Sequence, residues 1–275
     1  MSSLRLAQGR VVGESDLEES QPLLSLSHVY FQYGRGSFGL ADLSLQVNPG
    51  EVVGLIGPNG SGKTTALRVA LGLLGAHQGD IQIGGIGVKT DPHAARTAVA
   101  VVPDTPRGFE HLTLSEYLRL YGAVQRADGD YRARVEALLE PFGLKGSLNR
   151  CISELSTGTK RKAVAIAAFA LGRPLLVVDE ATSALDPEAV ILLGRLIERR
   201  SRAGNGCLIA TQDLAFAERI CHRVVLLSNG RTLADGTPRD LATRYRSKDL
   251  FGVFTSATGL DDVLDKLDAS LDPSV

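Results

Sequence analysis

Cysteine is scarce in this chain of 275 residues. Cys151, Cys207 and Cys221 form no CxxC pair, are odd in number, and lie in apolar or helical surroundings. A small buried thiol is the simplest interpretation of such residues. The sequence therefore gives no sign of a disulfide framework, and it fits the reducing environment of the cytoplasm.

The chain also has little net charge and no long apolar run. Its formal charge is -1 at pH 7, so we expect neither nucleic acid nor an anionic membrane surface as a partner. The longest apolar stretch, residues 163–171, is shorter than the roughly 20 residues needed to cross a bilayer. Residues 1–21 carry Arg5, Arg10 and several acids without a continuous apolar segment. We therefore expect a disordered tail there and no secretory signal.

The most informative segment that is present is a glycine-rich loop. Residues 57–64 read Gly-Pro-Asn-Gly-Ser-Gly-Lys-Thr and directly follow the apolar stretch Val52–Ile56. This order predicts a strand that ends in a loop, which opens a helix near Thr65. The backbone N–H groups of such a loop turn inward around a phosphate chain, and the helix N-terminus adds a partial positive charge. The loop is therefore predicted to bind the phosphates of a nucleotide.

Two side chains at the end of this loop have distinct expected roles. Lys63 can reach the outermost phosphates, and Thr64 can place its hydroxyl on a magnesium ion. The following helix is expected to bury Leu67 and Leu74 on one face and to end at Gly75.

Strand and helix patterns alternate as is typical of an α/β fold. Residues 22 to about 100 predict strands and turns around one helix, and residues 104 to about 171 become helical. The uninterrupted apolar run Leu175–Val178 predicts a parallel strand covered on both faces. We therefore expect one nucleotide-binding domain over residues 22–240, interrupted by a helical subdomain over about residues 104–171.

Two acids, Asp179 and Glu180, leave that strand at the edge of the sheet where the phosphate loop also ends. A carboxylate there can hold magnesium through water, and the next one can orient or deprotonate an attacking water. Two acids after a strand could otherwise be solvated turn residues. Their pairing with the phosphate loop favours the catalytic interpretation.

These motifs occur together with Leu155-Ser-Thr-Gly-Thr159 and Ser183-Ala-Leu-Asp186. In their order and spacing, over about residues 24–235, the chain resembles an ATP-binding cassette (ABC) ATPase. The resemblance implies a P-loop NTPase ABC ATPase core with an N-terminal antiparallel β subdomain and a helical insert. In this family two cassettes dimerise head to tail, and each ATP lies between the phosphate loop of one cassette and the signature segment of the other.

Ser156 and Gly158 belong to the signature segment. Ser156 offers a hydroxyl, Gly158 permits a close backbone approach, and the helix that follows directs its positive end outward. The simpler alternative is that Ser156 only caps that helix. Tyr33 matches the family's aromatic platform for adenine, although an aromatic residue in a strand is also a common core residue.

The resemblance implies ATP and Mg²⁺ as cofactors. The residues expected to bind ATP are Tyr33, Gly57, Pro58, Asn59, Gly60, Ser61, Gly62, Lys63, Thr64, Thr65, Ser156 and Gly158. Those expected at the metal are Thr64, Asp179 and Asp104, and those expected in catalysis are Glu180, Gln212 and Asp104.

The sequence departs from the family pattern in three places. Asp104 stands where the family usually has a Gln that contacts magnesium and the attacking water, and an acid can still bind magnesium through water. Thr157 and Thr159 replace a Gly and a Gln of the signature. Gln212 replaces a His that contacts the γ-phosphate, and a neutral amide carries neither a proton nor a positive charge. We therefore expect a slow ATPase, or one competent site in a mixed pair.

The signature region, residues 155–163, and the acid at position 104 resemble the branch that serves drug, antibiotic and polysaccharide exporters. Lys160-Arg161-Lys162 fits a solvated helix face better than a nucleic-acid contact. Residues 241–275 resemble the small C-terminal appendage of such cassettes, with a strand over 249–256 and then an amphipathic helix.

The leading hypothesis is the ATP-hydrolysing subunit of an ABC exporter. We expect it to lie on the inner face of the cell membrane through a separate transmembrane permease, and to pair with a second cassette. ATP would draw the two cassettes together and hydrolysis would release them. Two alternatives stay open: a soluble ABC ATPase of an assembly system of the iron–sulfur type, and a regulatory cassette with weak hydrolysis.

Overall fold

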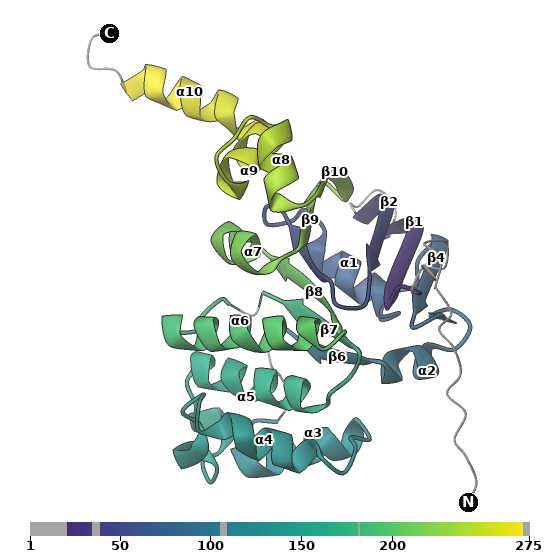
Figure 1. Cartoon of the computed structure of the whole chain (residues 1–275), viewed down its shortest axis with the longest axis vertical. Coiled ribbons are helices and arrows are strands. Elements are labelled where there is room, and N and C mark those ends of the chain that lie inside the picture. The colour runs from purple at the N-terminus through teal and green to yellow at the C-terminus, as the bar shows by residue number, and fades with distance from the viewer. Residues whose placement is uncertain (1–20, 35–38, 105–108, 181, 272–275) are drawn as a thin grey trace, which may run out of the picture.

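Two β-sheets with helices packed around them make up the fold (Figure 1). The computed structural model describes residues 21–34, 39–104, 109–180 and 182–271. The predicted tail over residues 1–21 therefore lies outside the described residues, except for Gln21.

The larger sheet has six strands in the order β10-β9-β3-β8-β7-β6. All neighbours in it are parallel except β10, which runs antiparallel to β9. Its strands are β3 (Val52–Ile56), β6 (Val99–Val102), β7 (Leu175–Asp179), β8 (Gly206–Thr211), β9 (Arg223–Ser228) and β10 (Arg231–Gly236). Because the carboxyl ends of parallel strands meet at one edge of a sheet, the loops after β3, β6, β7 and β8 lie near one another.

The central strands are buried on both faces, as their unbroken apolar sequences predict. In β7, Leu176 and Val178 belong to the hydrophobic cluster on the side of the helical insert, whereas Leu175 and Val177 belong to the cluster beneath the second sheet. The residues of β3 divide between the two clusters in the same alternating way. A helix-covered parallel sheet is thus confirmed, and its two cores meet across β3 and β7.

The smaller sheet is antiparallel and has the order β2-β1-β4-β5. Its strands are β1 (Leu24–Gln32), β2 (Gly39–Val47), β4 (Gln78–Ile83) and β5 (Ile86–Gly87). Shifts of pairing register after Leu26 and Val29 let β1 continue as one strand. The predicted N-terminal antiparallel subdomain is confirmed.

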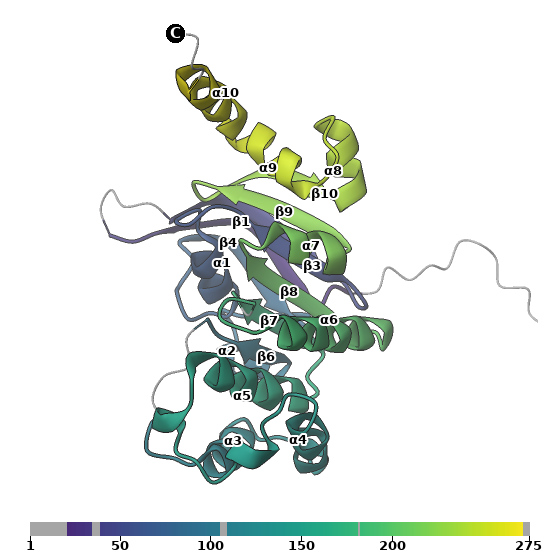
Figure 2. The same ribbon diagram turned by 90° about the vertical axis from the view of Figure 1, so that its left-hand side faces the viewer.

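The loop after β3 leads into α1, and α1, α5, α6 and α7 pack on the larger sheet (Figure 2). The helix bounds are α1 (Lys63–Ala70), α2 (Pro92–Thr97), α3 (Leu114–Val124), α4 (Tyr131–Leu139), α5 (Thr157–Ala170), α6 (Pro187–Arg202) and α7 (Leu214–Ile220), with short 3₁₀ turns at Lys145–Ser147 and Ile152–Glu154. Two boundaries differ from expectation: α1 begins at Lys63 rather than Thr65 and ends at Ala70 rather than Gly75. Sequence analysis did not predict α2, whose start is capped by Asp91 before a proline.

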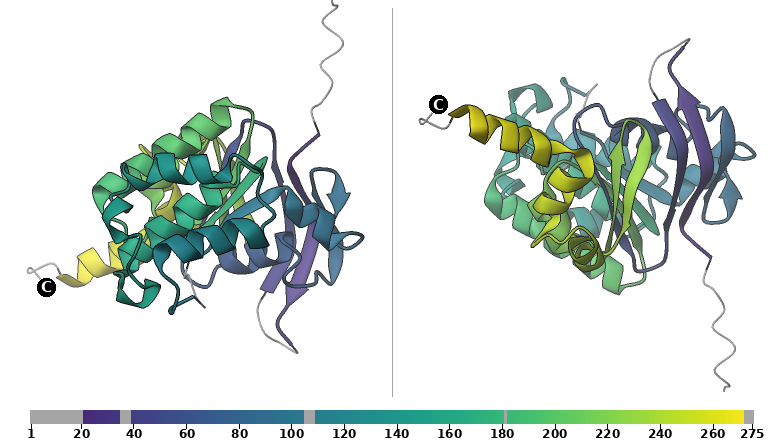
Figure 3. Two further views of the ribbon diagram at one scale, coloured as in Figure 1. Left: turned by 90° about the horizontal axis from the view of Figure 1, so that it is seen from below. Right: turned by 90° about the horizontal axis from the view of Figure 1, so that it is seen from above.

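Helices α3 and α4 pack on α5, on the side away from the smaller sheet (Figures 1 and 3). A capping box begins α3, since Thr113 and Glu116 satisfy each other's backbone N–H groups. The phenol of Tyr131 donates to the carbonyl of Leu118 at 2.9 Å and ties α4 to α3. The helical insert therefore has its own small core, joined to the sheet through α5.

Three helices follow the larger sheet: α8 (Pro238–Arg244), α9 (Leu250–Thr258) and α10 (Leu260–Leu271). The strand predicted over 249–256 is wrong. Asp249 caps α9 by accepting the N–H of Gly252, and Leu250 and Val253 turn the same way into the core. Apolar residues three apart bury one face of a helix, and this tertiary contact decides the conformation of a segment with strand-like composition.

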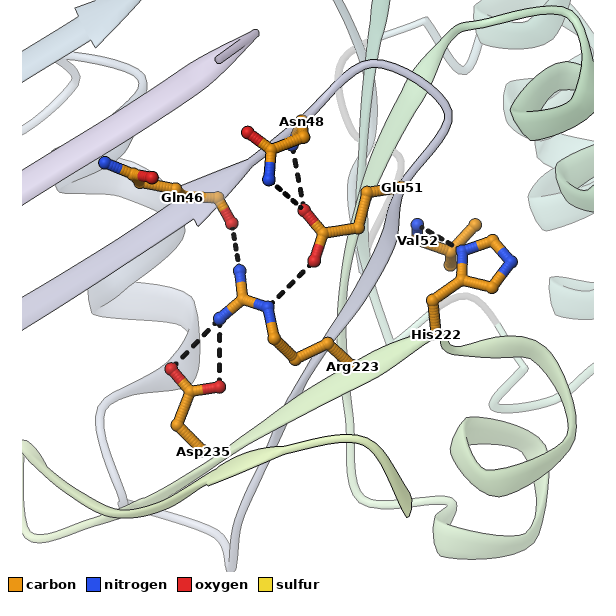
Figure 4. A network of polar contacts seen from close by, with 7 residues as sticks. All are labelled: Gln46, Asn48, Glu51, Val52, His222, Arg223 and Asp235. Atoms are coloured by element: carbon orange, nitrogen blue, oxygen red, sulfur yellow. Dashed lines mark hydrogen bonds and ion pairs between the residues drawn. The ribbon is translucent and has the colours of Figure 1, made fainter. Parts of the chain in front are cut away.

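A partly exposed polar junction joins the two sheets at the start of β9 (Figure 4). Arg223 donates to Glu51 at 2.8 Å, to both carboxylate oxygens of Asp235, and to the carbonyl of Gln46. One guanidinium therefore connects β2, the turn before β3, β9 and β10. The fork of donors on arginine suits several acceptors at once.

Among the described residues, no helix has the length and apolar character needed to cross a bilayer. Cys207 and Cys221 are buried free thiols, as expected, and burial raises the pKa of both. They are therefore core residues without reactive thiolate character.

Candidate active site

The loop between β3 and α1 has the backbone shape of a phosphate cradle. Gly62 caps α1 with φ 107°, and Gly57 has φ 157°. A Cβ on Gly57 would lie 2.2 Å from the carbonyl oxygen of Leu227, so no larger residue fits there. The glycines are thus required both by conformation and by close packing against β9.

Lys63 points back over this loop. Its Nζ donates to the carbonyl of Gly57 at 2.8 Å and to that of Pro58 at 3.3 Å. It also lies 3.6 Å from Oε1 of Glu180, and the lysine side chain is only 6% exposed. A nearly buried ammonium held by two carbonyls and one carboxylate can exchange these contacts for phosphate oxygens.

Thr64 and Asp179 face each other across the edge of the sheet. The Thr64 hydroxyl donates to Oδ1 of Asp179 at 3.3 Å. Burial is the main cause that raises the pKa of Asp179, and the nearby Asp104 and Glu180 raise it further, while the bond from Thr64 opposes this. A cation placed at this carboxylate would relieve the crowding of negative charge.

Hydrogen bonds hold both the backbone and the carboxylate of Glu180. Its backbone N–H donates to the carbonyl of Ala210 at 2.9 Å, and its Oε2 accepts the N–H of Gln212 at 3.4 Å. Its φ of 50° is in the left-handed region, which a non-glycine residue seldom occupies. The neighbouring strand and the loop after β8 therefore fix this carboxylate in the cleft.

The Tyr33 ring stands at the opposite end of the cleft. Its hydroxyl lies 3.2 Å from that of Thr65, and its ring meets Phe31 edge to face with centroids 4.8 Å apart. Tyr33 is 42% exposed, whereas Phe31 is buried. The exposed ring is thus not a core residue, and a face is open for stacking.

Tyr33, Lys63, Thr64 and Glu180 border a cleft of about 370 Å³, whereas Asp179 and Gln212 are not among its lining residues. It is lined by Tyr33, Gly39, Asn59, Gly60, Ser61, Gly62, Lys63, Thr64, Thr65, Asp104 and Glu180. Among the described residues, Ser61 is notable because its hydroxyl is buried without a hydrogen-bond partner. A polar atom left unpaired at a cleft wall indicates a ligand that would satisfy it.

Not every predicted residue lies at this cleft. Ser156 and Gly158, at the start of α5, do not line it. Ser156 caps α5, since its hydroxyl accepts the N–H of Thr159 at 3.2 Å. A Cβ on Gly158 would lie 2.7 Å from the carbonyl oxygen of Ala184, so its close approach is to this chain's own turn.

Asp104 lies at the cleft and meets a residue that sequence analysis placed on a solvated face. Its Oδ1 accepts a hydrogen bond from Nη2 of Arg161 at 2.7 Å, and Arg161 is 12% exposed. The neighbouring Lys162 pairs with Asp186 at 2.5 Å. The prediction of a solvated basic face is therefore wrong for both, because α5 lies against the loops after β6 and β7. In the sequence, the acid at position 104 was the signal that could have indicated a basic partner such as Arg161.

Comparison with known proteins identifies the family. The sequence profile of the ABC transporter family matches residues 40–183. Over 231 residues the chain is 33% identical to the ABC-type transporter ATP-binding protein EcsA of Bacillus subtilis (strain 168), and the match covers 82% of this chain and 92% of that protein. It is 34% identical over 252 residues to a Nod factor export ATP-binding protein I of Cupriavidus pinatubonensis, covering 91% of this chain and 75% of that protein.

The solved structures agree. The structure of an ATP-binding subunit of an ABC transporter is 34% identical, has a TM-score of 0.81, and covers 86% of this chain and 99% of its own. The predicted resemblance is confirmed, and with it the P-loop ATPase fold. This chain belongs to the ABC transporter family, as one of its ATP-binding ATPase subunits.

Proposed function

We propose that the chain hydrolyses MgATP in the cleft above α1 and so powers a separate membrane subunit, as part of an exporter. One observation carries the proposal: the phosphate loop brings Lys63 to within 3.6 Å of Glu180 and Thr64 to within 3.3 Å of Asp179. Phosphoryl transfer to water needs a phosphate-binding cation, metal ligands and a base close together, and these four side chains offer such groups.

The cleft suits a nucleotide triphosphate. The proposed contacts are Tyr33 with the base, and Gly57, Pro58, Asn59, Gly60, Ser61, Gly62, Lys63, Thr64 and Thr65 with the phosphates. The unpaired Ser61 hydroxyl and the nearly buried Lys63 ammonium support this assignment. ATP would supply the phosphoanhydride bond that is cleaved.

Mg²⁺ suits the acids beside the phosphate loop. Thr64, Asp179 and Asp104 offer oxygen ligands only, and within the described ranges no three His, Cys, Asp or Glu side chains gather into a cage. Mg²⁺ is commonly held in this way, by one or two carboxylates plus substrate phosphates. It would neutralise phosphate charge, and the raised pKa of Asp179 supports a cation there.

Glu180 is the proposed general base, because its carboxylate is oriented by Lys63 and by the N–H of Gln212. The Gln212 side chain would contact phosphate without carrying a proton, so we expect slow turnover. Gln212→His would raise turnover and introduce an acid limb in the pH profile if this assignment is right.

A second cassette would complete the site. Ser156 is exposed, it stands at the N-terminus of α5, and it lies outside the cleft of its own chain. A helix N-terminus favours an anion. We therefore propose that Ser156 and Gly158 contact nucleotide held by the other cassette.

The relatives support the membrane partner and the direction of transport. One is named for Nod factor export, and a structural relative is described as part of the complex cbiONQ. We propose a peripheral position on the inner face of the membrane through a permease. We also keep the division into a core over residues 22–240, a helical part over about 104–171 and an appendage over 241–275.

The residue at position 212 is a specific reason to keep one other candidate, a regulatory cassette that binds ATP with little hydrolysis. Glu180→Gln separates the two. If the chain is an ATPase with Glu180 as its base, the variant binds MgATP as the parent does and loses at least about a hundredfold in turnover. Equal turnover in parent and variant would remove Glu180 from the role of base, and no turnover in the parent with its membrane partner would favour the regulatory cassette.

A further inference from the structure

Arg161 connects three segments around the cleft from its position in the second turn of α5. Its Nη1 donates to the carbonyl of Glu180 at 2.9 Å and to that of Ser183 at 2.6 Å, and its Nη2 donates to Asp104 at 2.7 Å. Within the described residues, its Nε is buried without a partner. A buried N–H without a hydrogen-bond partner costs free energy. A guanidinium held in place in spite of this cost is more typical of a functional constraint than of a solvated helix face.

The contact to Glu180 acts on a strained backbone. Glu180 has φ 50°, a conformation that persists only where surrounding contacts fix it. Its carbonyl accepts the N–H of Ser183 at 3.2 Å in addition to the bond from Arg161. Without the guanidinium, the Glu180 carbonyl would keep only the bond from Ser183 among the described residues, and the direction of the carboxylate would be less fixed.

Asp104 fixes the other end of the guanidinium. Its carboxylate balances the charge of Arg161 and selects one orientation of the planar fork. Asp104 also lines the cleft. A displacement of Asp104, in the loop after β6, would therefore affect the backbone of Glu180 through two hydrogen bonds. One joins Arg161 to Asp104, and the other joins Arg161 to the Glu180 carbonyl.

We propose that Arg161 is a positioning residue for Glu180, and that Asp104 holds the Arg161 guanidinium in the orientation that this requires. The inference rests on the proposed role of Glu180 as base. It gives Asp104 a role in addition to the proposed binding of Mg²⁺. It also explains why an acid at position 104 and an arginine at position 161 occur in the same chain.

Kinetics of full-length variants test this. Arg161→Met should lower kcat by about tenfold or more, because a charge-assisted hydrogen bond to the Glu180 carbonyl is lost, and KM for ATP should change less than about twofold. Arg161→Lys should recover part of the rate, and Asp104→Asn should also lower kcat. If Asp104 acts in part through Arg161, the loss in the double variant should be smaller than the product of the two single losses.

Arg134 provides a matched control. It also binds an acid and a backbone carbonyl, Asp128 and Ala170, but at the other end of α5. Arg134→Met should lower the melting temperature about as much as Arg161→Met and leave kcat unchanged. A parallel loss of kcat in both variants would mean that Arg161 is only structural.

A second measurement does not need turnover. Hydrogen exchange at the amides of Ser183 and Leu185 should become faster in Arg161→Met than in the parent, and not in Arg134→Met. In a Glu180→Gln background, Arg161→Met should cause no further loss of rate. If Glu180→Gln is fast, the proposed function fails. If Glu180→Gln is slow but Arg161→Met keeps the parent's turnover rate and amide exchange rates, the positioning role of Arg161 is wrong and the proposed function still stands.

Discussion

The Nζ atom of Lys63 lies 3.6 Å from Oε1 of Glu180, so the lysine of the phosphate loop and the acid after β7 form an ion pair inside the cleft. Lys63 is 6% exposed and Glu180 17%. The proposed phosphate-binding lysine and the proposed base are therefore partners in one ion pair, so a phosphate bound by the lysine would compete with the carboxylate.

Removal of this lysine should abolish nucleotide binding. Lys63→Ala should weaken MgATP binding by about a hundredfold or more, because several charge-assisted hydrogen bonds are lost together. Calorimetric titration measures this, with Lys89→Ala as a control, since Lys89 is exposed and also bonds a carbonyl. Unchanged affinity in Lys63→Ala would contradict the phosphate site.

The ring of Tyr33 should matter more than its hydroxyl. Tyr33→Phe keeps the stacking face and loses only the contact to Thr65, so ATP affinity should stay within about threefold. Tyr33→Ala should lose about tenfold, since stacking on a base contributes roughly 1–3 kcal/mol. Tripolyphosphate, which has no base, should bind both variants and the parent equally; a loss there would mean that Tyr33 shapes the phosphate loop instead.

Gly158→Ala should destabilise the protein although alanine favours helices. The new Cβ would lie 2.7 Å from the carbonyl oxygen of Ala184. Overpacking of this kind costs about 1–3 kcal/mol, which outweighs the gain of roughly 1 kcal/mol in helix propensity. Gly146→Ala has open space around it and should change the unfolding free energy by less than about 0.5 kcal/mol. Equal melting temperatures for the two variants would rule out the clash.

The ionised form of Asp179 should destabilise the protein when no cation is present. Its native pKa is raised above 3.8, so the neutral form contributes stability that is complete below that pH and is lost as the pH rises through the native pKa. Asp179→Asn keeps the acceptor for Thr64 and removes the charge. In chelator without nucleotide, its melting temperature should therefore exceed that of the parent at neutral pH, by about 2–4 °C for each 1 kcal/mol.

The difference should shrink as the pH is lowered through the native pKa of Asp179, because the parent then becomes protonated. Saturating Mg²⁺ should shrink the difference at neutral pH. A difference that is independent of pH would assign the effect to something other than the charge of Asp179.

The phosphate loop, the strands beside it and the acids after β7 were predictable because local chemistry specifies them. Glycines, a lysine and an apolar run in fixed order permit few alternatives. The helix α9 was not predictable from its composition, because Phe, Val and Thr also favour strands and only burial of Leu250 and Val253 decides. Strand β4 was missed because its sequence, Gln-Gly-Asp-Ile-Gln-Ile, has few apolar residues, and pairing with β1 stabilises it.

The sequence by itself determined the family, the α/β core and the residues that surround the phosphate cradle, because each depends on residues close together in the chain. Only the tertiary structure decided that Arg161 is mostly shielded from solvent and that it bonds Glu180 and Asp104. It likewise decided that Ser156 lies outside its own chain's cleft. The physical reason is distance along the chain. The helical periodicity of α5 does not predict which loops pack against its charged face. The parallel strands bring the loops after β6 and β7 to that face.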